Sequence, residues 1–116
     1  MADTKGGPDV PAISTGSLKQ KPVFIEVING VITCTPDTVE LGKNNDVEWI
    51  YNPGGVVVEF ETTRPFGKKR HEAVGGSVRS GPNDCKEHER FKYKVTVPDP
   101  KVRPLDPIVD VDPARP

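Results

Sequence analysis

The chain has 116 residues and a formal net charge of −1, so it has room for one small domain and lacks the basic excess of a general nucleic-acid binder. Thirteen prolines and eleven glycines argue against long helices, and no stretch is apolar enough to cross a bilayer. The N-terminus has no apolar signal-peptide centre, which predicts a cytoplasmic protein for the chain as written. If a leader was removed, the expected location is the periplasm or outside the cell.

The first twenty residues mix Gly, Pro, Ser, Thr and Lys with few apolar groups, so they cannot bury enough surface to offset the entropy of ordering. We therefore expect a disordered tail over residues 1–20, a domain over residues 21–112, and a C-terminal tail over residues 113–116. Residues 23–28 form the first predicted strand. Asn29 and Gly30 after it predict a tight hairpin turn, because both tolerate a positive φ.

Three segments that follow alternate apolar and polar side chains, as a strand does when one face lies on a core and the other in water. The predicted inward residues are Val39 and Leu41 in the first segment, Val47, Trp49 and Tyr51 in the second, and Val56, Val58 and Phe60 in the third. The turn formers Asn52, Pro53, Gly54 and Gly55 separate the second segment from the third.

The alternation fails over residues 62–83, where Gly, Pro and charged groups predict a long loop with one short strand near residues 74–78. It returns over residues 90–97, where Phe91, Tyr93, Val95 and Val97 are predicted to face inward. Residues 107–111 predict a last strand with Val109 and Val111 inward. About seven short strands joined by turns predict an all-β sandwich or barrel.

Four motifs stand in a recognisable order: Pro36-x-x-Val39-x-Leu41, Asp46-Val47-x-Trp49, Val56-x-Val58-x-Phe60 and Phe91-x-Tyr93-x-Val95-x-Val97. Together with the Asn-Pro-Gly-Gly turn they resemble the cupredoxin pattern of plastocyanin-like blue-copper proteins, over residues 23–111. The resemblance implies a Greek-key β-sandwich of about seven short strands.

The resemblance also implies where copper would bind. One His would follow the turn before the fourth strand, and a Cys, a second His and a weak axial Met would lie on the loop after the penultimate strand, because thiolate and imidazole suit copper. Here the turn leads into Gly55 and Val56, and residues 98–107 contain no Cys, His or Met. No ligand carries over, so we expect a non-catalytic binding or structural module without type 1 copper.

Cys85 and His88 have a Cys-x-x-His spacing, which leaves a copper-binding electron-transfer protein with displaced ligands as an alternative. With His71 they would make the smallest set that holds copper or another transition metal. The competing interpretation of His71 is one more member of a solvated basic run.

Cys34, Trp49 and Cys85 also resemble the immunoglobulin arrangement, in which a tryptophan packs on a disulfide between the sheets. A disulfide between Cys34 and Cys85 is compatible with either sandwich. Without an export signal, two reduced thiols are the default expectation.

Basic residues gather in the middle of the chain, where residues 64–94 carry nine Lys and Arg against four Asp and Glu. A candidate patch for a polyanion or nucleic acid comprises Lys68, Lys69, Arg70, Arg90, Lys92 and Lys94. A basic row also keeps an exposed sheet soluble, and no outward aromatic residue is available to stack on bases.

The sequence carries no motif of a hydrolase nucleophile, a phosphate-binding loop or a zinc protease. We therefore expect neither an enzyme nor a cofactor. The expected state is a monomer that binds a protein or an anionic ligand and does not bind a membrane.

Overall fold

The computed structural model describes residues 20–115, so the tail predicted over residues 1–20 lies outside the described residues apart from Gln20. Nine strands and no helix are present in this range, which confirms the all-β prediction. The strands are β1 (Gln20–Ile28), β2 (Val31–Thr35), β3 (Thr38–Leu41), β4 (Asp46–Ile50), β5 (Val56–Phe60), β6 (Arg70–Ala73), β7 (Ser77–Arg79), β8 (Glu89–Thr96) and β9 (Ile108–Val111). None of the described residues forms a helix that could cross a membrane.

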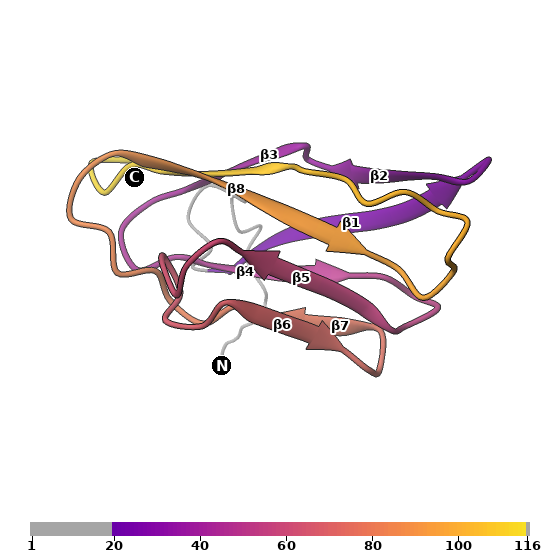
Figure 1. Ribbon diagram of the computed structural model, residues 1–116. Coiled ribbons are helices and arrows are strands. Elements are labelled where there is room, and N and C mark those ends of the chain that lie inside the picture. Colours follow the sequence, from indigo (N-terminus) through magenta and orange to yellow (C-terminus); the bar gives the residue numbers. More distant parts are fainter. Residues whose placement is uncertain (1–19, 116) are drawn as a thin grey trace, which may run out of the picture.

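The strands form a two-layer sandwich (Figure 1). One sheet has four strands in the order β2-β1-β4-β7, and the other has five in the order β3-β9-β8-β5-β6. The pairs β1/β4 and β3/β9 are parallel, whereas the other neighbouring strands are antiparallel. Several connections therefore carry the chain from one sheet to the other, as between β2 and β3 and between β6 and β7.

Side chains from both sheets fill the space between them, as the two-residue period predicts. The predicted inward residues that are buried are Val39, Leu41, Val47, Trp49, Val56, Val58, Phe60, Tyr93, Val95, Val97, Val109 and Val111. Tyr51 and Phe91 are half-buried and pack against the same core. The inward pattern of the strands is thus confirmed.

Trp49 lies at the centre of this core and is fully buried. Its ring centroid lies 5.4 Å from that of His71, 5.6 Å from that of Tyr93, and 6.2 Å from those of Phe60 and Phe66. Tilted and edge-to-face arrangements of this kind are the favourable ones for aromatic rings. The cluster of five rings joins β4, β5, β6, β8 and the segment before β6.

The prediction of one short strand near residues 74–78 is confirmed only in part. β7 begins within this range, at Ser77, and belongs to the four-stranded sheet, but a second strand, β6, precedes it in the five-stranded sheet. Residues 74–76 turn the chain from one layer to the other, and Gly76 has a φ of +106° that a residue with a side chain rarely adopts. Val74 is 82% exposed because it lies on this turn.

β8 runs along the sandwich, so the segments before and after it lie at opposite ends (Figure 1). Eight extended residues span about 26 Å. The end on the right of Figure 1 carries the β1–β2 turn, residues 51–55, residues 74–76 and the β8–β9 connection, and we call it the hairpin end. The opposite end carries residues 42–45, 61–69, 80–88 and 112–115.

Candidate functional site

The segments on which the cupredoxin resemblance would place copper ligands both lie at the hairpin end. These are residues 51–55 before β5 and residues 97–107 after β8. The two segments touch, since a Cβ built on Gly55 would lie 2.7 Å from Pro98 Cγ. Their side chains offer no thiolate, imidazole or thioether. The residues present therefore do not fit a type 1 copper ion, which needs soft sulfur and nitrogen ligands.

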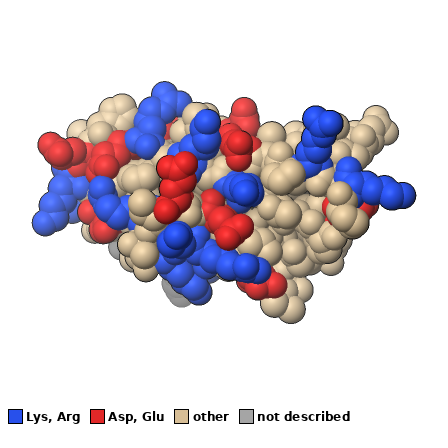
Figure 2. Space-filling view, viewed as in Figure 1, with Lys and Arg blue, Asp and Glu red and all other residues tan. Residues whose placement is uncertain are grey.

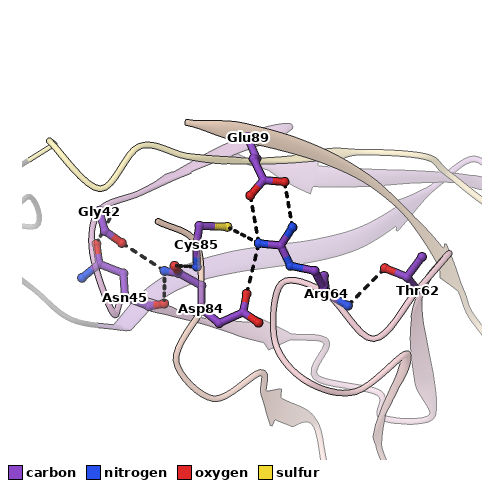
Figure 3. A network of polar contacts seen from close by, with 8 residues as sticks. Gly42, Asn45, Thr62, Arg64, Asp84, Cys85 and Glu89 are labelled. Atoms are coloured by element: carbon purple, nitrogen blue, oxygen red, sulfur yellow. Dashed lines mark hydrogen bonds and ion pairs between the residues drawn. The ribbon is translucent and has the colours of Figure 1, made fainter. Parts of the chain in front are cut away.

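Cys85 lies at the opposite end, inside a polar network (Figure 3). The Arg64 guanidinium donates two hydrogen bonds to the Glu89 carboxylate, at 2.9 and 2.8 Å, and a longer one of 3.7 Å to Cys85 Sγ. Arg64 also contacts Asp84 Oδ1 at 3.4 Å and lies 5.6 Å from the centroid of the Phe91 ring. A bidentate guanidinium–carboxylate pair fixes the orientation of both groups. It links the start of β8 to the segment that precedes β6.

The loop that holds Cys85 is anchored by an amide side chain. Asn83 Nδ2 donates to the carbonyl oxygens of Gly42 and Asn45, at 3.0 and 2.9 Å, while Asn83 Oδ1 accepts from the Cys85 backbone N–H at 3.1 Å. Asn83 is buried, so these bonds satisfy groups that water does not reach. The network therefore joins the loop that holds Cys85 to the loop between β3 and β4.

Both cysteines of the chain are free and buried. Burial, followed by the neighbouring Asp37 carboxylate, raises the pKa of Cys34 to about 12. Burial, followed by the Glu89 carboxylate, raises the pKa of Cys85 to about 11, although Arg64 opposes this shift. Thiols of this kind are poor nucleophiles and poor metal ligands near neutral pH, because the thiolate is the reactive form.

His88 belongs to a second network on the outer side of the five-stranded sheet. Its Nε2 lies 2.8 Å from Oδ1 of Asp110, a carboxylate that is also 3.5 Å from Arg90 and 3.4 Å from Arg115. Arg115 further donates to the carbonyl oxygens of Leu41 and Asp110, at 3.0 and 3.1 Å. Burial raises the pKa of Asp110, but the His88 and Arg115 contacts outweigh it, so the net shift is downward.

The interpretation of His71 as part of a solvated basic run is wrong. Its side chain is 2% exposed, because position 71 faces inward on β6 and lies opposite Val58 on β5. Its Nε2 lies 3.1 Å from the Lys68 carbonyl oxygen. Burial lowers the pKa of His71. The hydrogen bond to the Lys68 carbonyl oxygen raises this pKa and the positive charge of Lys68 lowers it, and the net shift is downward. The ring is therefore a neutral member of the aromatic core.

The structure does not bring the three displaced-ligand candidates together. Cys85 contacts Arg64, His88 contacts Asp110, and His71 packs against Trp49. Across residues 20–115 no group of three or more His, Cys, Asp and Glu side chains is arranged to hold a metal ion.

Most of the candidate basic patch is interleaved with carboxylates. One hollow on the outer face of the five-stranded sheet is lined by Lys69, Lys92 and Lys94 together with Glu59, Glu61 and Asp106. Arg90 pairs with Asp110 and Arg70 with Glu72, both at 3.5 Å, while Lys68 lies on the turn before β6. Figure 2 shows blue and red groups intermixed over the left and centre of this view. The positive charge of the candidate basic patch is thus largely balanced by neighbouring carboxylates.

A different surface, at the hairpin end, has only positive side chains among the charged described residues that line it. A hollow of about 340 Å³ lies between the β1–β2 hairpin and the β8–β9 connection. Its apolar part comes from Val31, Ile32, Pro104 and Leu105, and its charged part from Lys101 and Arg103. We call it the hairpin groove. No carboxylate is among the described residues that line it.

The β8–β9 wall of the hairpin groove is fixed in place. Val102 is buried in the core, and Leu105 exchanges two backbone hydrogen bonds with Val95, at 2.8 and 3.1 Å. Arg103 forms a parallel bridge with Val31 on the opposite wall. The groove is thus a formed feature of the fold.

Apolar surface continues from the groove over the outer face of the four-stranded sheet. Val31 is 61% exposed, Ile28 lies directly opposite it at 54%, and Phe24 is 50% exposed. Our sequence reasoning missed these residues. A signal was present, because residues 23–28 are apolar on both faces apart from Glu26, which is unusual for a strand with one side in water.

No protein-family model matches the chain, and no curated protein matches it.

Proposed function

We propose that this protein is a cupredoxin-like, Greek-key domain that has no type 1 copper and acts as a non-catalytic binding module. The observation that carries the proposal is the β8–β9 connection. Where the resemblance calls for Cys, His and Met, residues 97–107 instead supply Pro98 against Gly55, a buried Val102 and the wall of the hairpin groove. Packed side chains close this end of the sandwich, and the hairpin groove lies beside them.

Two further features support the proposal. Consecutive strands lie in different sheets at β2/β3, β3/β4, β4/β5, β6/β7 and β7/β8, in keeping with a Greek-key arrangement. Arg64 and His88 also have structural partners: Arg64 binds Glu89, and His88 binds Asp110. An acid or base for catalysis needs access to a substrate proton, and a nucleophile needs a lowered pKa. Cys85 has a raised one.

A copper titration tests the proposal. Cu(II) is added to the full chain and to the matched variants Cys85→Ser and Cys34→Ser, and the visible spectrum is recorded. We expect no intense thiolate-to-copper band from any of the three proteins. A strong band in the unmodified chain that disappears in Cys85→Ser and persists in Cys34→Ser would establish a copper protein with displaced ligands and end the proposal.

A further inference from the structure

We infer that the hairpin groove binds an extended, acidic segment of a partner protein, in which apolar side chains alternate with carboxylates. The inference gives the proposed binding module a site and a class of partner. It rests on the shape of the groove, on its two cations without an ion pair among residues 20–115, and on the exposed Val31 and Ile28 beside it.

The charge of the groove sets the chemistry of the partner. The side chains of Lys101 and Arg103 are exposed, and neither forms an ion pair within residues 20–115. The nearest acids along the connection are Asp99, whose Oδ1 accepts a hydrogen bond from the Lys101 backbone N–H at 2.9 Å, and Asp106, which lines the hollow on the outer face of the five-stranded sheet. Two cations beside an apolar floor are complementary to carboxylates that flank apolar side chains.

The same surface differs from the other charged surfaces of the molecule. On the outer face of the five-stranded sheet, Lys94 lies opposite Glu59, and Glu59 lies opposite Arg70, so charges of opposite sign already neighbour one another. In Figure 2 the Lys and Arg groups on the right stand on a mostly tan surface, with only small red areas beside them. An acidic partner is attracted most strongly where no carboxylate of the chain competes with it.

The extent of the surface favours a protein segment over a small molecule. A small-molecule site encloses most of its ligand, whereas this groove is shallow and opens onto Val31. Beyond Val31 the apolar surface continues to Ile28, its cross-strand neighbour. Phe24 lies four residues further along the same face of β1, beyond the exposed Glu26, so it is separate from this surface. Val31 and Ile28 thus extend the apolar surface past the groove, where an extended peptide segment has contacts that a small molecule would not reach.

Fluorescence anisotropy with a defined probe tests the inference. The probe is a labelled peptide of about ten residues that alternates leucine and glutamate, and the control peptide alternates leucine and lysine. We expect saturable binding of the acidic probe to the full chain, weakened as salt rises from about 0.05 to 0.5 M. The control peptide should not bind measurably.

Charge reversal locates the site. The double variant Lys101→Glu/Arg103→Glu should weaken binding by about tenfold or more, as should Val31→Asp, which places a repelling carboxylate on the apolar wall. The matched control is Lys43→Glu/Lys86→Glu, which changes the charge equally at the opposite end, where both lysines are exposed. It should bind within about twofold of the unmodified chain. Unchanged urea midpoints, followed by Trp49 fluorescence, show that all variants fold.

Three results would overturn the inference. The acidic probe shows no saturable binding, or the Lys43/Lys86 control loses as much affinity as the groove variant, which would indicate general attraction of polyanions. Alternatively, the chain self-associates and Val31→Asp abolishes this, which would assign the surface to a second copy. None of these three results changes the outcome of the copper titration. The inference about the groove and the proposal of a module without type 1 copper can therefore fail independently.

Discussion

His71 gives the clearest physical prediction, because it is a titratable ring inside an aromatic core. Burial lowers its pKa below the ordinary value of 6.5. The unfolded chain therefore binds more protons than the folded chain as the pH falls below about 6.5. The stability associated with a neutral His71 is present above that pH and is lost as the pH falls toward the folded pKa.

The size of the effect follows from proton linkage. A single group changes the free energy of unfolding by at most about 1.4 kcal/mol per pH unit. For a domain of this size each kcal/mol corresponds to a shift in Tm of about 4–8 °C. The change of the unfolding free energy with pH should therefore be easy to measure between pH 7.5 and 5, where the carboxylates remain mostly ionised.

Urea unfolding followed by Trp49 fluorescence at several pH values measures this slope. His71→Phe keeps a ring at the inward position of β6 and removes the titrating group, so its stability should change little between pH 7.5 and 5. The chain has only one other histidine, His88. His88→Gln is the matched control and should retain the slope. Equal slopes in the unmodified chain and His71→Phe would refute the reasoning.

Three further predictions concern Asp110, Gly42 and the two cysteines. Asp110→Asn should cost about 1–2 kcal/mol at pH 7, because Arg90 and Arg115 lose their carboxylate and His88 loses an ionised hydrogen-bond partner. Since the folded pKa of Asp110 is lowered, this difference should vanish as the pH falls through that pKa in acid urea titrations. Gly42→Ala should destabilise the full chain, because the new Cβ would lie 2.7 Å from the Arg115 carbonyl oxygen. The loss of stability should be smaller in a chain that ends at Asp112, because this chain lacks Arg115. Calorimetry of both chain lengths, each with and without Gly42→Ala, measures the difference. An equal loss of stability in the two lengths would contradict the contact. Cys34 and Cys85 should react with a disulfide reagent at pH 8 far more slowly in the folded chain than in urea, given their raised pKa values of about 12 and 11; rapid labelling of either thiol in the folded chain would be the opposite result.

The strands could be predicted where one face is apolar over several alternations. In β8 the sequence Phe91-Lys92-Tyr93-Lys94-Val95 marks the inward side unambiguously, and Trp49 stands in a similar pattern in β4. β6 has only four residues, Arg70 to Ala73, so its alternation of exposed and buried positions is hidden among charges. That brevity explains why His71 was assigned to the solvent.

The candidate sites were harder to predict because they depend on contacts between distant residues. Nothing local relates Arg64 to Glu89, or Asp110 to His88. The hairpin groove likewise joins Val31 to Arg103, two residues whose proximity follows only from the packing of the two sheets. The distribution of charge along the sequence was also a poor guide to the candidate surface. The basic residues between positions 64 and 94 are mostly balanced by carboxylates on neighbouring strands, whereas Lys101 and Arg103 form no ion pair within residues 20–115.

The pairing of distant strands has a consequence for how fast this chain acquires its fold. Thr38 in β3 pairs with Ile108 in β9, and β1 pairs with β4 across the whole of β2 and β3. Few of the pairs are local hairpins, the clearest being β1/β2. Sandwiches that rely on such non-local pairing have a high contact order and fold on the order of milliseconds to seconds, because long loops must close before their contacts stabilise anything.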